Sequence, residues 1–157
     1  ENPYIEKASL FMTIDGTLNS FIKQRQPIAR IFTGNSSYYI DSQAVKVPIS
    51  ENYSARVPLI TGVDDEKEVS ELMVLLNKIV GDDFLNKEIV GIHLQATKEY
   101  MMTVRSGDYT IEFGKLTAID SKIKKLKAFY SKVFLDSTIH KYKTINIKYH
   151  NQVVGIK

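Results

Sequence analysis

Two stretches of the chain carry apolar residues at helical spacing, and strand-like runs precede, separate and follow them. In the first stretch, residues 65–80, the apolar positions form one face of a helix: Val69, Leu72, Met73, Leu76, Ile79 and Val80. In the second, residues 118–134, they recur at intervals of 4, 3, 4 and 3: Ile119, Ile123, Leu126, Tyr130 and Val133. This order of elements predicts an α+β fold, in which two main helices pack on a largely antiparallel sheet.

Turn signals divide the rest of the chain into strands. Asp15-Gly16 lies between two β-favouring runs, and Ser106-Gly107 lies between two more, so we expect a hairpin at each. Further strands are expected at residues 28–32, 37–40, 88–97, 143–149 and 152–156. The Pro- and Gly-containing residues 43–62 indicate a connecting loop with short extended pieces. Asp65 and Glu68 have the spacing of a capping box at the start of the first helix.

Composition narrows the class of protein. The 157 residues suit one domain or one domain plus a fragment, and the absence of cysteine excludes disulfides and thiolate metal sites. No apolar run approaches the roughly 20 residues that span a bilayer. The chain begins at Glu1 rather than at a methionine, so we expect a preceding segment.

Charge is distributed unevenly. Residues 1–114 hold 11 basic and 16 acidic side chains, whereas residues 115–157 hold 10 lysines, no arginine and two aspartates. A basic tail can meet nucleic acid or an anionic membrane surface, but a solvated lysine-rich helix face explains it more simply. Arginine is the usual residue for bidentate contacts to bases and phosphates, and its absence leads us to expect no nucleic-acid partner.

The sequence offers one enzyme-like motif. Thr13-Ile14-Asp15-Gly16-Thr17-Leu18 is similar to the haloacid-dehalogenase signature, but Thr13 stands where that chemistry needs the nucleophilic aspartate. His93, His140 and His150 lack the spacing of a metal pair. We therefore expect no catalytic residue, metal or cofactor. The alternative is a small sugar-binding or hydrolytic domain that uses Asp15, Asp41 and a histidine, which requires a pocket where the carboxylates converge.

Several segments, in order along the chain, resemble the FtsQ/DivIB family of bacterial cell-division proteins. Residues 25–29, Arg-Gln-Pro-Ile-Ala, resemble the Arg-x-Pro-x-Ala element of that family, and Tyr38-Tyr39-Ile40-Asp41 resembles the strand that follows. Residues 57–62 resemble its Val-Pro-x-Ile-x-Gly loop, and residues 102–114 resemble its hairpin before a lysine-bearing helix. Residues 145–149 resemble its terminal strand, with Asn146 and Lys148 where Asp and Arg are usual. The Tyr-Tyr pair and the preference for lysine are most similar to the Bacteroidetes branch of that family.

The resemblance implies a domain organisation and a setting. Residues 1–30 would be the C-terminal hairpin of a truncated POTRA domain, and residues 31–157 would be the β domain. Such a protein is a non-catalytic scaffold of the divisome. It lies on the extracytoplasmic, periplasmic side of the inner membrane at the division site, anchored by one upstream transmembrane helix.

The resemblance also implies partners and a binding site. The partners would be FtsB-like and FtsL-like divisome proteins, with one partner adding a strand beside the terminal strand. We expect residues 143–149 to be an edge strand, because an edge has free N–H and C=O groups that suit strand addition. The implied partner-binding residues are Asn146, Lys148, Tyr149, Val153, Val154 and Ile156. Ile145 and Ile147 are expected to pack into the core.

Overall fold

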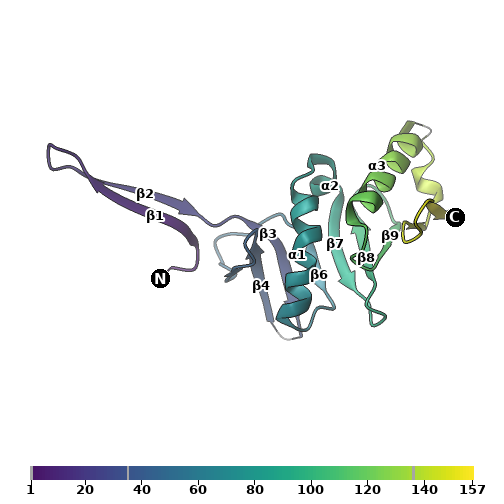
Figure 1. Cartoon of the computed structure of the whole chain (residues 1–157), viewed down its shortest axis with the longest axis horizontal. Coiled ribbons are helices and arrows are strands. Elements are labelled where there is room, and N and C mark those ends of the chain that lie inside the picture. Colours follow the sequence, from purple (N-terminus) through teal and green to yellow (C-terminus); the bar gives the residue numbers. More distant parts are fainter. Residues whose placement is uncertain (1, 35, 136) are drawn as a thin grey trace.

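The computed structural model describes residues 2–34, 36–135 and 137–157, which form two sheets (Figure 1). The first sheet is a hairpin of β1 (Ile5–Met12) and β2 (Leu18–Gln24). The second has nine strands in the order β11 (Val154–Ile156), β10 (Thr144–Asn146), β9 (Thr110–Gly114), β8 (Tyr100–Val104), β7 (Ile89–Leu94), β6 (Leu59–Thr61), β3 (Pro27–Thr33), β4 (Ser36–Asp41) and β5 (Lys46–Val47). The hairpin extends beyond one end of the large sheet, and β11 lies at the other end.

The pairing of the large sheet confirms the α+β class with mostly antiparallel strands. Five of its eight pairings are antiparallel, and the exceptions are β3 with β6, β6 with β7, and β9 with β10. Strand β6 lies in the middle of the sheet, although the sequence indicated a loop across residues 43–62. Its three residues are too few to show an alternating pattern, so only its neighbours reveal it as a strand.

The helices are α1 (Glu66–Val80), α2 (Asp83–Glu88) and α3 (Ile119–Leu135), followed by a 3₁₀ turn at Ile139–Lys141. The predicted start of α1 is confirmed: the Asp65 carboxylate accepts from the Glu68 backbone N–H at 2.7 Å. Glu68 completes the cap one residue earlier than the usual box, by accepting from the Asp64 N–H at 2.9 Å. The short α2, capped by Asp82, was not predicted. In the described parts of the chain, no helix combines the length and apolarity that crossing a membrane requires.

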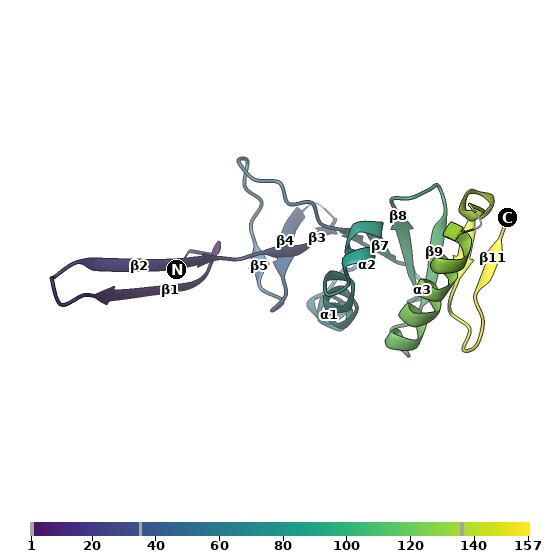
Figure 2. The same cartoon turned by 90° about the horizontal axis from the view of Figure 1, so that it is seen from above.

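The two long helices cover one face of the large sheet (Figure 2). Strand residues that point to this face, such as Ile60, Ile92 and Ile111, are buried with the apolar sides of α1 and α3 in one core. The intervening residues point to the opposite face, where Phe32, Leu59 and His93 are exposed. The sheet therefore has a covered face and an open face.

A polar cluster fixes α3 within this core. The Glu88 carboxylate at the end of α2 accepts hydrogen bonds from the hydroxyls of Ser106, Tyr109 and Tyr130, the last on α3. Burial, more than any other cause, raises the pKa of both tyrosine phenols, so they remain donors at neutral pH. Each hydroxyl of this cluster thus has a partner, as a well-packed interior requires.

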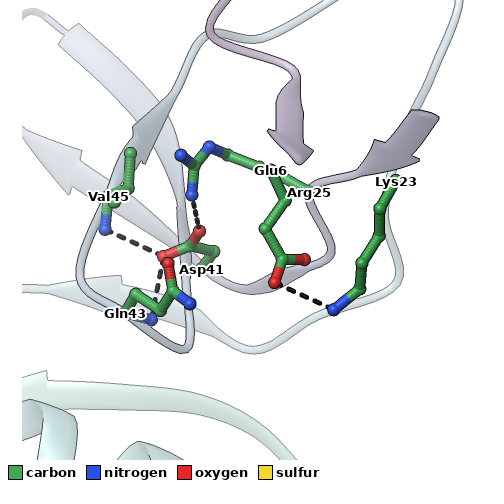
Figure 3. A network of polar contacts seen from close by, with 6 residues as sticks. All are labelled: Glu6, Lys23, Arg25, Asp41, Gln43 and Val45. Carbon is green, nitrogen blue, oxygen red and sulfur yellow. Dashed lines mark hydrogen bonds and ion pairs between the residues drawn. The ribbon is translucent and has the colours of Figure 1, made fainter. Parts of the chain in front are cut away.

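An ion pair connects the hairpin to the large sheet (Figure 3). Just after β2, Arg25 Nη1 donates to Asp41 Oδ2 at 2.6 Å, and both side chains are largely buried. Asp41 Oδ1 also accepts from the backbone N–H groups of Gln43 and Val45, both at 2.9 Å, which stabilises the turn after β4. The boundary that we drew between residues 30 and 31 falls inside β3.

Candidate partner-binding site

The C-terminal edge of the large sheet is β11, the second of the two strands predicted near the chain end. Strand β10, within the segment expected to be the edge, instead lies between β9 and β11. That expectation is therefore wrong. Thr144–Asn146 pair in parallel with Thr110–Glu112 on one side, and β11 folds back antiparallel on the other side. Residues 147–153, which lie between the two strands, are long enough for the chain to reverse its direction.

Both side chains of β11 point to the same face of the sheet, because its middle residue is Gly155. Val154 and Ile156 are 36% and 52% exposed. They pair across the ladder with Asn146 and Thr144, whereas Gly155 pairs with the core residue Ile145. Residues directly opposite each other share a face, so Val154 and Ile156 lie on the open face and Gly155 lies on the helix side. The edge thus presents two apolar side chains that no helix covers.

The other predicted site residues lie inside this edge or beside it. Asn146 is buried, and its amide donates to Glu112 Oε2 at 2.5 Å. Tyr149 is 52% exposed in the segment between β10 and β11. Val153 is partly buried against the core. As expected, Ile145 and Ile147 are fully buried.

Lys148 is held by two carboxylates, those of Glu112 in β9 and of Glu99 just before β8. Its Nζ lies 3.0 Å from Glu99 Oε2 and 3.4 Å from Glu112 Oε2. The pKa of the Lys148 ammonium is raised above its ordinary value, mainly by the hydrogen bond to Glu99. The side chain therefore stays charged, and it ties the segment after β10 to Glu112 and Glu99.

Three residues that shape the edge were not singled out from the sequence. Tyr142 packs edge-on against Phe129 of α3, with 5.5 Å between ring centroids, and it also contacts Gly155. Lys125 of α3 donates to carbonyl oxygens of the segment that follows β10. A glycine inside a predicted strand often marks a close approach, so Gly155 was the available signal.

Replacing Gly155 with alanine should displace β11. A Cβ atom at this position would overlap the Tyr142 ring, which Phe129 holds from behind. We expect a loss of about 1–3 kcal/mol in the free energy of unfolding, measured by urea denaturation, from overpacking. The variant Gly155→Ala/Tyr142→Leu removes the ring and should recover part of the loss. A single alanine variant as stable as the unaltered protein would contradict this packing.

Positive charge gathers at one end of the same edge. Residues 137–157 contain four lysines and no aspartate or glutamate. Lys143 and Lys157, both exposed, flank the paired residues Thr144 and Ile156, so they lie at the same end of the edge. This end is suited to a segment that carries acidic side chains.

The alternative site does not form. Asp15 lies in the exposed turn at the tip of the β1–β2 hairpin, where the Thr13 and Thr17 hydroxyls donate to it and lower its pKa. Asp41 is paired with Arg25, at the opposite end of that hairpin. The junction between the hairpin and the large sheet, where Arg25 lies, holds a cavity of about 240 Å³. It is lined by tyrosines, prolines and Arg25, but by neither aspartate. The three histidines are exposed, and no group of metal-ligating side chains is found among the described residues.

Comparison with known proteins shows which family the chain resembles. The family described as "FtsQ/DivIB, C-terminal related" matches residues 26–156, which include the whole nine-stranded sheet. The chain belongs to this family. The matched region begins one residue before β3 and ends at the last residue of β11, so the family unit coincides with the large sheet and its helices.

A curated relative extends the comparison to a longer protein. The chain is 28% identical over 149 aligned residues to "Cell division protein FtsQ" of Geotalea daltonii, a match that covers 79% of this chain. It covers 52% of the relative, so the chain spans about half the length of that protein.

Proposed function

We propose that this domain is a non-catalytic assembly module of the bacterial division machinery, which recruits FtsB-like and FtsL-like proteins by strand addition at β11. Membership of the FtsQ/DivIB family supports a role in cell division. The observation that carries the mechanism is the free edge of β11, which has Val154 and Ile156 exposed on the open face. A partner strand would gain main-chain hydrogen bonds along the edge and apolar contacts with these two side chains.

Tyr149 and the lysines at the end of the edge would complete the contact. Tyr149 is exposed next to the strand, and the lysines favour a partner segment with acidic side chains. The effect of Asn146, Lys148 and Val153 on partner binding would be indirect: they would keep β10 and the connecting segment in place. Because exposed charges are screened by salt, binding should weaken as ionic strength rises.

A variant of the edge tests the proposal. The probe is a set of overlapping 20-residue peptides that cover the extracytoplasmic part of the FtsB-type protein from the same organism. One peptide should shift the NMR signals of residues 143–156, and Ile156→Ser should weaken its binding about tenfold, because the apolar contact is lost. The matched control is Ile49→Ser, which changes an exposed isoleucine near β5, at the opposite edge. Unchanged signals in the unaltered protein would refute the interface.

The hairpin supports a second part of the proposal, that residues 1–30 complete a POTRA domain. One face of the ribbon carries exposed apolar side chains, among them Leu10, Met12, Leu18 and Ile22. A two-stranded hairpin is marginally stable alone, so this face suits packing against further chain. We propose that the full-length protein is anchored by one upstream transmembrane helix and lies on the periplasmic side at the division site. In that protein, the chain packed against the hairpin should protect these residues from limited proteolysis.

A further inference from the structure

Lys125 connects α3 to the segment that leads into the edge strand. Its Nζ donates to the carbonyl oxygen of Ile147, at 3.3 Å, and to that of Tyr149. Both carbonyls lie at the start of residues 147–153, which join β10 to β11. An ammonium group has three donors and no acceptor, so it can satisfy two carbonyls at once.

The position of β11 depends strongly on such contacts. The strand has three residues and, among the described strands, pairs with β10 alone. Its two side chains, those of Val154 and Ile156, are both exposed. Short strands with few buried contacts belong to the least stable parts of a protein and open without global unfolding. A contact that holds the connecting segment therefore increases the time that β11 spends in place.

The first half of that segment is already restrained on its other side. The Ile147 N–H donates to the Glu112 carbonyl at 3.0 Å, and the Lys148 N–H donates to the Asn146 side chain at 3.0 Å. These bonds hold the N–H groups, whereas Lys125 holds the carbonyls that point toward α3. In the middle of β11, α3 acts through Phe129, which packs against the Tyr142 ring beside Gly155. Helix α3 thus restrains the edge at two places, at residues 147–149 and at Gly155.

We infer that Lys125 is a positioning residue, which keeps β11 in the conformation that a partner strand pairs with. It touches no partner itself, and its effect on binding rests on the proposed function. Ordering the edge in advance removes part of the entropy cost of association. Lys125 should therefore affect partner affinity without lying in the interface.

The free protein gives the first test. Lys125→Met keeps most of the aliphatic stem and removes all the donors, whereas Lys125→Arg keeps charge and donors. Backbone amides of Val154–Ile156 should exchange at least fivefold faster with deuterium in Lys125→Met, with the midpoint of thermal unfolding changed little. Lys125→Arg should restore most of the protection. The matched control Lys124→Met removes an exposed lysine one position earlier in α3 and should leave exchange unchanged.

Partner binding gives the second test. The FtsB-type peptide that binds the unaltered protein should bind Lys125→Met about tenfold more weakly, and binding should return with Lys125→Arg. Unchanged exchange in Lys125→Met, or faster exchange with unchanged affinity, would overturn the inference. If no peptide binds the unaltered protein, the proposed function fails, and the exchange result alone decides whether Lys125 holds the edge.

Discussion

Replacing Asp41 with alanine is expected to lower the free energy of unfolding by about 3–5 kcal/mol, because it leaves the largely buried Arg25 guanidinium without its counter-charge. The change also removes the acceptor of two backbone N–H groups, those of Gln43 and Val45. Urea denaturation followed by circular dichroism measures the loss. Asp41→Asn keeps a carbonyl oxygen for the two N–H groups, so its loss should be smaller.

The neighbouring pair in Figure 3 provides the control. Lys23 and Glu6 are 2.8 Å apart, but Lys23 is about half exposed. Exposed pairs contribute about 0–1 kcal/mol, so Lys23→Met should change stability by no more than that. A double-mutant cycle with Arg25→Met and Asp41→Asn then isolates the coupling of the buried pair. If Asp41→Ala cost no more than Lys23→Met, the pair would not be what fixes the junction.

Replacing Gly62 with alanine is expected to cost about 3–5 kcal/mol. Gly62 follows β6 with φ +79°, and a Cβ atom there would overlap the backbone carbonyl of Leu94 at the end of β7. Backbone cannot rotate away as a side chain can, so β6 and β7 would have to separate in the middle of the sheet. The cost adds overpacking to the strain of a left-handed conformation, which is about 1–2 kcal/mol for a residue with a Cβ.

Gly16 separates these two contributions. It has nearly the same backbone angle, φ +82°, in the exposed turn of the hairpin, and a Cβ atom there would meet nothing within 4 Å. Gly16→Ala should therefore cost only the conformational part, about 1–2 kcal/mol by the same denaturation measurement. Equal losses for the two variants would show that the approach of Leu94 is unimportant.

Much of the fold follows from local patterns in the sequence. The two long helices, the Asp65 cap and both Asp-Gly and Ser-Gly hairpins are as predicted, because each depends on residues within a few positions of one another. The order of the pieces that resemble the FtsQ/DivIB family also came from the sequence, and the family match confirms that membership. The binding residues implied by the resemblance remain proposals.

The candidate site depends on which strand lies outermost, and that is a non-local property. Nothing in residues 143–156 distinguishes an outer strand from an inner one, because both segments are short and partly apolar. The structure places β10 inside and β11 at the edge, since β10 can pair with β9 and β11 at once. For the same reason, the sequence did not reveal that β6 lies in the middle of the sheet.

The sequence by itself therefore determined the helices, the hairpin turns, the helix cap and the family, since spacing and turn chemistry act over a few residues. Tertiary structure alone decided the pairing of Arg25 with Asp41, the approach of Gly62 to Leu94, and the hold of α3 on the edge through Lys125 and Tyr142. These contacts join residues 13 or more positions apart in the sequence. Strand order and packing bring them together, and no local pattern encodes either.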